Sequence, residues 1–120
     1  ADFIGGANLI PARIGPLGAV AAGLGLVEAK GKTDEEVTLA IRPERLAIVP
    51  EARRQSGDLG PLTVAERVYM GNELSFRLEG AAVPLHVTLP RGGLRGALDF
   101  APGDCVVLRP EPGAIRVLHT

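Results

Sequence analysis

The phrase Gly31-Lys32-Thr33 contains the residue types that close a phosphate-binding loop. Such a loop also needs a glycine six residues before the lysine, so that successive backbone N–H groups can surround the phosphates. Position 26 is leucine, and Gly25 lies one residue too far from Lys32. An alternating apolar pattern follows instead of a helix signal. The phrase therefore predicts a hairpin turn rather than a nucleotide site.

Three further side chains, His86, Cys105 and His119, are soft metal ligands by type. They lack the close spacing in which zinc ligands occur as pairs, so we expect no metal site. His86 stands opposite the apolar positions of its segment and is expected to face solvent. Ser56 and Ser75 have no plausible base partner in the sequence, and a hydroxyl without a base is a poor nucleophile. We therefore expect no catalytic residue in this chain.

The composition favours a β-rich domain with an aliphatic core. The chain has 120 residues, which suits one domain, and it is 46% hydrophobic but only 3% aromatic. It contains 16 glycines and 10 prolines, residues that interrupt helices and are frequent in tight turns. The net charge of −1 and the few aromatic side chains disfavour a nucleic-acid partner, which requires positive charge and stacking surfaces.

Other features bear on where the chain resides. Its single cysteine, Cys105, cannot form an internal disulfide, which fits a reduced, cytosolic compartment. No apolar run approaches the roughly 20 residues of a membrane span, and the first residues show no signal-peptide pattern. The chain opens without methionine. We expect a fragment of a longer protein, and a processed mature chain is the alternative.

Alternation with a period of two is the main secondary-structure signal. Val37, Leu39 and Ile41 alternate with Thr38 and Ala40, as in a strand with one buried face. This pattern predicts an all-β fold, a small barrel or sandwich of short strands without a convincing helix. Further strands are expected at 8–14, 24–29, 46–49, 63–70, 73–78, 83–89, 105–108 and 114–118, and loops at 50–61 and 90–96.

Three details of these strands are open to test. Pro11 lacks a backbone donor, so its strand is expected at a sheet edge or at a bulge. Val64, Val68 and Met70 are expected on one apolar face. Segment 15–25 is rich in Ala and Gly and fits either a loop or a poorly defined strand.

Two segments of the chain look alike. The first runs from Val37-Thr-Leu39 through Arg42-Pro43-Glu44 to Ala47-Ile48, and the second from Val106-Val-Leu108 through Arg109-Pro110-Glu111 to Ala114-Ile115. Each predicts a strand, a sharp stop at proline and a short following strand. The repeat fits two similar sub-barrels or two similar corners of one barrel, and chance similarity is a third interpretation.

The tripeptide Arg42-Pro43-Glu44 is the most distinctive of the chain and allows two interpretations. In one, its charged side chains contact a partner or a ligand. In the other, Arg42 and Glu44 pair with each other at a half-buried turn. We favour the second, because paired charges at a proline corner satisfy each other.

Four phrases, in order along the chain, resemble one known family. Ala1-Asp-Phe-Ile-Gly-Gly-Ala-Asn-Leu-Ile10 is similar to the phrase that follows the nucleotide-binding domain in ABC import ATPases, and Val37-Thr-Leu-Ala-Ile-Arg-Pro-Glu44 to its V-x-L-x-I-R-P-E phrase. Two later phrases of the same family resemble Val68-Tyr-Met-Gly71 with Leu74-Ser-Phe-Arg-Leu78, and Phe100-Ala-Pro-Gly-Asp104. The family is the TOBE (transport-associated OB) domain of importer ATPases for spermidine/putrescine, iron(III) and related solutes. Segment 15–25 is richer in Ala and Gly than this family suggests, and Met70 stands where leucine is usual.

The resemblance implies one OB-like β-barrel over residues 1–120, appended to a nucleotide-binding domain. It implies that the phosphate loop, the signature motif and the catalytic glutamate, together with ATP and Mg, belong to that upstream domain, and that this chain holds no cofactor. The implied partners are the upstream domain, a second ATPase subunit in a homodimer and, indirectly, the membrane permease subunits. The implied location is cytoplasmic, peripheral to the inner membrane.

The resemblance also implies a regulatory and assembly role, in which Arg42, Glu44, Tyr69 and Asn72 contact a partner. The alternative is a small-oxyanion sensor, in which backbone N–H groups at glycine-rich turns hold the anion. An OB-type nucleic-acid binder is a third hypothesis, which the charge and the few aromatic residues disfavour.

Overall fold

The computed structural model describes residues 3–4, 6–90 and 100–119. Within these ranges strands are the main secondary structure, and the all-β prediction is confirmed. Most of the predicted loop at 90–96 lies outside the described residues. The strands and the short 3₁₀ turns (η) are β1 (Phe3–Ile4), β2 (Ala7–Gly15), β3 (Gly18–Ala21), β4 (Gly25–Val27), β5 (Glu36–Ile41), η1 (Pro43–Arg45), β6 (Leu46–Pro50), η2 (Glu51–Arg53), β7 (Leu59–Met70), β8 (Glu73–Glu79), β9 (Leu85–Pro90), β10 (Cys105–Pro110) and β11 (Ile115–His119).

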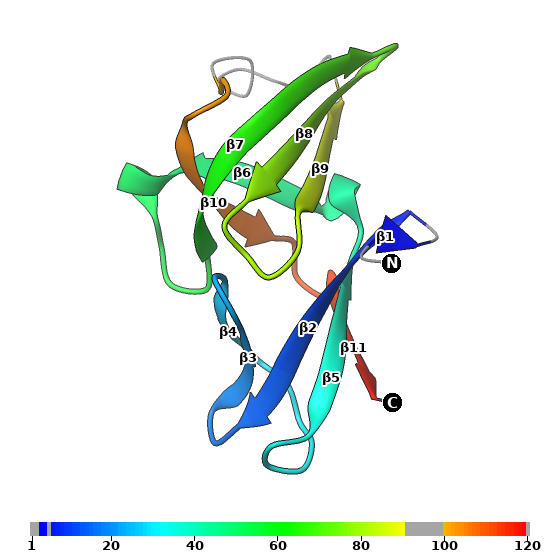
Figure 1. Cartoon of the computed structure of the whole chain (residues 1–120), viewed down its shortest axis with the longest axis vertical. Coiled ribbons are helices and arrows are strands. Elements are labelled where there is room, and N and C mark those ends of the chain that lie inside the picture. Colours follow the sequence, from blue (N-terminus) through cyan, green and yellow to red (C-terminus); the bar gives the residue numbers. More distant parts are fainter. Residues whose placement is uncertain (1–2, 5, 91–99, 120) are drawn as a thin grey trace.

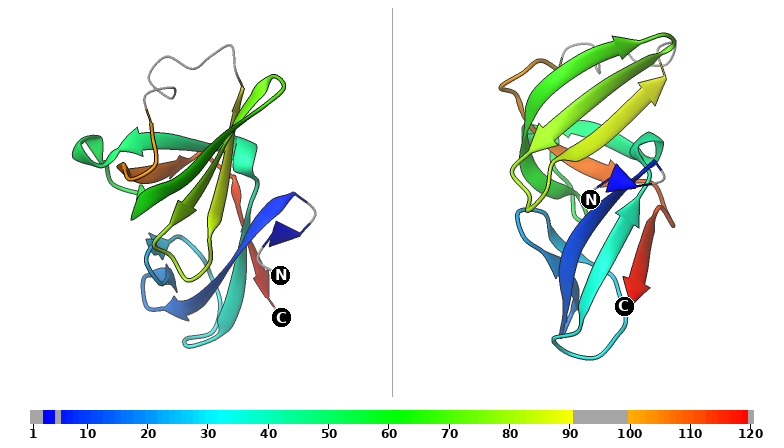
Figure 2. Two further views of the ribbon diagram at one scale, coloured as in Figure 1. Left: turned by 45° about the horizontal axis from the view of Figure 1, so that its top comes forward. Right: turned by 45° about the vertical axis from the view of Figure 1, so that its right-hand side comes forward.

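The strands form two antiparallel sheets that follow one another along the long axis of the molecule (Figure 1). Sheet A has the order β11-β5-β2-β3-β4, with β1 paired to β2. Sheet B has the order β6-β10-β7-β8-β9. Figure 2 shows the same division from two further directions. The arrangement is that of a small OB-like barrel.

Alternating side chains of both sheets meet in one contiguous aliphatic core. In β5, Val37, Leu39 and Ile41 are buried, whereas Thr38 and Ala40 are only half-buried, as their spacing predicts. Sheet B contributes similar residues, together with the aromatic ring of Phe76. Removing this apolar surface from water, at about 25 cal/mol per Å², is the main force that holds the sheets together.

The described strands lead from one sheet to the other twice, and each passage contains one Arg-Pro-Glu tripeptide. The first runs from β5 through η1 to β6, and the second runs from β10 to β11. Because β5 pairs with β11 and β6 pairs with β10, the two passages lie antiparallel beside each other. The backbone N–H of Glu111 donates to the carbonyl of Arg45 at 3.0 Å and joins them. The repeat therefore corresponds to two similar corners, which we call the first and the second corner.

Pro11 lies inside sheet A, and the prediction of an edge strand or a bulge is wrong. On one side, β2 pairs with β5 from Asn8 to Arg13, with Pro11 opposite Thr38. On the other side, β2 pairs with β1 at residues 7 and 8 and with β3 only from Arg13 onward. Pro11 falls between these two short partners, so on this side no described strand pairs with it. A central strand therefore tolerates a residue that has no N–H to donate.

Strand β7 begins at Leu59, earlier than expected, and a bulge interrupts its pairing with β8 between Val64 and Glu66. Val64 is buried, but Val68 is 39% exposed and Met70 is 60% exposed, so the prediction of one apolar face is wrong. The physical reason is the bulge. One extra residue in an alternating strand exchanges the inward and outward positions that follow it.

Segment 15–25 contains the short strand β3, which pairs with both β2 and β4. Its glycines permit close backbone contacts. Gly18 has φ +139°, and a Cβ at this position would lie 2.4 Å from the carbonyl oxygen of Val27. A Cβ on Gly23 would lie 2.2 Å from the carbonyl oxygen of Gly80, which follows β8 in sheet B. The richness in glycine thus serves packing within sheet A and between the sheets.

Candidate functional site

The first corner buries its proline and exposes its charged residues. Arg42 precedes η1 in an extended conformation, and Pro43 is buried at the start of the turn. Arg42 and Glu44 are exposed, as a partner-contacting role requires. Among the described residues, the ion pair of this corner joins Arg45 Nε to Glu111 Oε2 at 3.1 Å, instead of Arg42 to Glu44 as expected.

Arg45 connects the two corners and was not singled out from the sequence. Besides its pair with Glu111, its Nη2 donates to the carbonyl of Pro112 at 3.1 Å. The side chains of Arg45 and Glu111 are 40% and 59% exposed, so the ion pair contributes at most about 1 kcal/mol to stability. Only the antiparallel crossing of the two corners brings these residues together, and a single tripeptide does not reveal it.

The second corner binds a buried carboxylate. Nε and Nη2 of Arg109 each donate to a carboxylate oxygen of Asp58 at 2.9 Å, and the Asp58 side chain is only 1% exposed. The backbone N–H of Gln55 donates to the same carboxylate at 2.8 Å. The bond from Arg109, followed by that from Gln55, holds the pKa of Asp58 below its usual range, although burial opposes the shift. The expectation of an exposed loop at 50–61 is therefore wrong for Asp58.

Asn8 is a polar residue buried between the sheets, with 0% of its surface exposed. Its Nδ2 donates to the carbonyls of Ile41 (3.1 Å) and His86 (2.9 Å). Its Oδ1 accepts the backbone N–H of His86 at 2.8 Å. One amide thus ties β2 and β5 of sheet A to β9 of sheet B with both donor and acceptor groups satisfied. His86 is half-buried at this junction, so the expectation that it faces solvent is only partly met.

Tyr69 and Asn72 lie at the tip of the β7–β8 hairpin, which forms the top of the molecule in Figure 1. Tyr69 is 52% exposed, and the guanidinium of Arg67 stands 5.9 Å from its ring centroid. Asn72 is exposed in the tight turn that follows Met70, where Gly71 has φ +61°. The four candidate contact residues therefore occupy two elements, a corner between the sheets and the tip of a hairpin.

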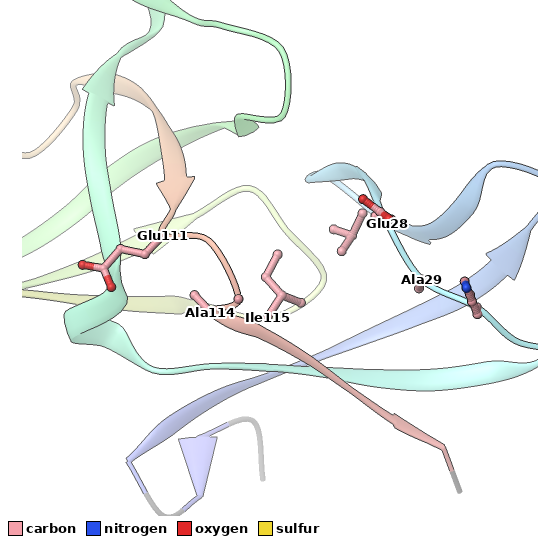
Figure 3. A pocket seen from close by; sticks show the side chains of 8 residues that line it. Glu28, Ala29, Glu111, Ala114 and Ile115 are labelled. Carbon is pink, nitrogen blue, oxygen red and sulfur yellow. The ribbon is translucent and has the colours of Figure 1, made fainter.

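A shallow hollow of about 370 Å³ lies between the loop of the second corner and the segment that follows β4. Figure 3 shows Ala114 and Ile115 on one side and Glu28 and Ala29 on the other, with the Glu111 carboxylate pointing away. The ammonium group of Lys30 and the carboxylate of Glu28 border this space, whereas the Glu111 carboxylate pairs with Arg45. One ammonium group beside one carboxylate disfavours an anion, because a site for an oxyanion requires converging donors or positive charge.

The Phe100–Asp104 turn has a structural role. Asp104 Oδ2 accepts the backbone N–H of Ala101 at 2.8 Å, and Gly103 has φ +97°. The turn exchanges two backbone hydrogen bonds with Val64, at the bulge of β7. Its Phe100 ring packs edge-on against Phe76 at a centroid distance of 6.5 Å. This phrase therefore fixes the bulge rather than forming a binding site.

The remaining chemical candidates are dispersed or structural. Gly31-Lys32-Thr33 lies in the loop between β4 and β5, in which the backbone N–H of Glu35 donates to the carbonyl of Lys32 at 2.9 Å. The prediction of a hairpin is wrong, because β4 and β5 are not neighbours in sheet A. Hydrogen bonds from His119 and then from the Lys32 N–H lower the pKa of Glu35. Cys105 is exposed. Over residues 6–90 and 100–119 no cluster of His, Cys, Asp and Glu could hold a metal ion, and no helix there is long and apolar enough to cross a membrane.

Comparison with known protein families matches residues 39–118 to the TOBE domain, over more than half of the chain. The chain belongs to the TOBE domain family. No curated protein matches it. TOBE domains are non-catalytic and are associated with the ATP-binding subunits of ABC transporters and with the binding of molybdate and other oxyanions.

The matched stretch runs from β5 to β11 and includes both corners of this TOBE domain. It also includes sheet B and the Phe100–Asp104 turn. Strands β1 to β4, with Asn8 and the glycine-rich segment 15–25, precede it. Segment 15–25, which is richer in Ala and Gly than the family suggests, thus lies before the matched residues.

Proposed function

We propose that this TOBE domain is a regulatory and assembly domain of the ATP-binding subunit of a bacterial ABC importer for a polyamine, iron(III) or a similar solute. The observation that carries the proposal is the TOBE match over residues 39–118, which spans both corners. The four phrases in family order support the importer context. In this role the domain performs no chemistry, and ATP and Mg bind to the upstream domain.

The proposed partners are the upstream nucleotide-binding domain and a second ATPase subunit, with the permease subunits contacted indirectly. The proposed location is the cytoplasmic side of the inner membrane. Arg42 and Glu44 offer exposed charges at the first corner, and Tyr69 and Asn72 an exposed aromatic ring and amide at the hairpin tip. Tyrosine and arginine are the types of residue that interfaces favour, so these are the positions we assign to partner contacts.

The test uses the complete subunit encoded by the reading frame that contains this chain, reconstituted with its permease. Charge reversal at the corner (Arg42→Glu with Glu44→Lys) and truncation at the tip (Tyr69→Ser) are expected to lower transport-coupled ATPase several-fold while basal ATPase persists. Glu51→Lys, on the exposed turn η2, is the matched control. If both variants match the control in subunit dimerisation and in coupling, the proposal fails.

The oxyanion-sensor alternative finds less support in the described residues. The hollow of about 370 Å³ offers one ammonium group, that of Lys30, beside the Glu28 carboxylate, and so no excess of positive charge. A second hollow, of about 640 Å³, contains Arg13, whose Nη2 already lies 2.8 Å from Glu36 Oε1. Calorimetric titration with molybdate, tungstate, sulfate and phosphate decides between the two functions. Heat of binding from any of these anions would favour the sensor.

A further inference from the structure

Strand β10 buries side chains on both of its faces. Val106 and Leu108 belong to the core between the sheets, and Val107, which alternates with them, belongs to the outer face of sheet B. Val107 is nevertheless 0% exposed, although it is not part of the core cluster. Within the sheet, Val49 of β6 stands opposite it and Gly60 of β7 lies close to its Cγ1. Neighbours in the same sheet leave a side chain open from above, so a further segment must cover this face of β10.

The loop between β6 and β7 lies on this face. Arg109 alternates with Val107 and therefore shares its face, and both carboxylate oxygens of Asp58 accept hydrogen bonds from Arg109 at 2.9 Å. Asp58 lies at the end of this loop, and η2 at its start also lies against β10. We call residues 51–58 the strap. Figure 1 shows it in green on the left-hand side of the molecule, beside β10.

The strap is held by polar contacts rather than by apolar side chains. Residues 51–57 are all exposed, and the strap has one hydrophobic side chain, that of Ala52. Besides the bonds from Arg109, the backbone N–H of Gln55 donates to the Asp58 carboxylate at 2.8 Å, and Nη1 of Arg54 donates to the carbonyl of Gly60 at 3.0 Å. A segment with so few buried apolar contacts opens at a lower free energy than the sheet that carries it.

We propose that the strap is a lid that opens and closes as one unit over the outer face of β10, with the Asp58–Arg109 pair as its latch. In the closed state the lid covers Val107 and supplies Arg109 with a carboxylate from within the chain. In the open state it uncovers an apolar side chain and a guanidinium next to each other. Any contact that uses the outer face of β10 therefore requires the lid to open first. The inference concerns this chain alone and goes beyond the proposed role in transport.

The reaction of buried cysteines with a thiol reagent tests the opening. Val107→Cys and Val106→Cys are compared in a Cys105→Ser background, because the two valines are adjacent, equally buried and on opposite faces of β10. The lid hides position 107 and the core hides position 106, so we expect position 107 to react about 100-fold faster under native conditions. Urea below the unfolding transition is expected to accelerate the reaction at position 106 much more strongly, since global unfolding exposes far more surface than opening of the lid. Equal rates at the two positions, or equal dependence on urea, overturn the proposal.

Amide hydrogen exchange tests the latch. Arg109→Lys keeps the positive charge but loses the two-point bond to Asp58. The N–H groups of Arg54 and Asp58 donate to the carbonyls of Glu51 and Gln55 within the strap, and neither of these bonds involves Arg109. If the strap moves as one unit, both amides are expected to exchange faster in Arg109→Lys by the same factor, about tenfold or more.

Arg45→Lys, which alters the ion pair between Arg45 and Glu111, is the matched control and is expected to leave both amides unchanged. Unequal acceleration of the two amides in Arg109→Lys, or the same acceleration in Arg45→Lys, overturns the lid. The cysteine comparison keeps the native latch, so it decides the proposal even if Arg109→Lys does not fold. Neither experiment involves ATPase activity, so failure here leaves the transport proposal standing, and the reverse holds as well.

Discussion

The two Arg-Pro-Glu corners share a sequence and a position between the sheets, but their charged side chains act differently. At the second corner, Arg109 binds the buried carboxylate of Asp58 through two hydrogen bonds of 2.9 Å. At the first corner, Arg42 and Glu44 lie exposed, and Arg45 makes the contact to the other corner. The proline has the same role in both, because it ends one strand and turns the chain toward the next sheet.

The comparison separates what a tripeptide determines from what its surroundings determine. The turn follows from proline and is local. The role of each arginine depends on what distant elements place beside it, and Asp58 reaches Arg109 from a segment 51 residues earlier in the chain. The second corner is therefore structural, whereas Arg42 and Glu44 of the first corner are exposed at the surface.

The largest expected effect on stability concerns Asn8, which links the two sheets at a position outside both corners. Asn8→Ala removes three hydrogen bonds, two to the His86 backbone and one to the Ile41 carbonyl. Because these bonds lie between the sheets and are buried or partly buried, we expect a loss of about 3 kcal/mol in the free energy of unfolding, measured in urea. Asn72→Ala, at the exposed tip, is the control and is expected to change stability by less than about 0.5 kcal/mol. Equal losses in the two variants would show that the amide between the sheets has no special role.

The next effect distinguishes the two corners directly. Asp58→Asn is expected to lower the free energy of unfolding by about 2 kcal/mol, because a charge-assisted, buried pair of hydrogen bonds is weakened. Glu44→Gln, at the equivalent corner, is expected to stay within about 0.5 kcal/mol of the native chain. Urea denaturation of both variants provides the measurement. If Glu44→Gln costs as much as Asp58→Asn, the distinction between a structural and an exposed corner is lost.

The same pair predicts a dependence on pH. The folded pKa of Asp58 is lowered, so its contribution to stability is present above the unfolded pKa of about 3.9 and disappears as the pH falls toward the folded value. The stability difference between the native chain and Asp58→Asn is therefore expected to be constant from pH 5 to 7 and to shrink below about pH 4. Urea titrations at four pH values measure it. A difference that persists unchanged at pH 2 would contradict the assignment.

The smallest effect concerns the bond between the corners. Arg45 and Glu111 are both partly exposed, so a double-mutant cycle with Arg45→Ala and Glu111→Ala is expected to give a coupling of about 0.2–1 kcal/mol. The coupling is expected to fall when salt is raised from 0.05 to 0.5 M, because screening weakens exposed pairs. A salt-independent coupling above about 2 kcal/mol would mean that this pair, rather than Asp58 and Arg109, secures the crossing.

Local signals predicted much of the fold. The alternation of Val37, Leu39 and Ile41 gave the buried face of β5, and proline marked both corners. The errors at Pro11 and Val68 have long-range causes, since they depend on where β1 and β3 end and on a bulge in β7. Neither is encoded in the residues of the strand itself.

The contacts of the candidate site were harder to predict from the sequence than the fold, for the same reason. Asp58 occupies a polar loop whose composition indicates exposure, and its partner lies in another strand. Asn8 stands in the first resembling phrase, yet only the packing of β9 against sheet A reveals what it binds. The roles of Arg42, Glu44, Tyr69 and Asn72 in partner contacts stay a prediction.

The most direct test of the account is to read the coding sequence upstream of Ala1. We predict a phosphate loop, an ABC signature motif and a catalytic glutamate within roughly 240 preceding residues, about one or two domain lengths. That result would place this TOBE domain in an importer ATPase and leave only the solute to be determined. A different upstream domain, or none, would contradict the transport proposal and make the oxyanion sensor the leading function.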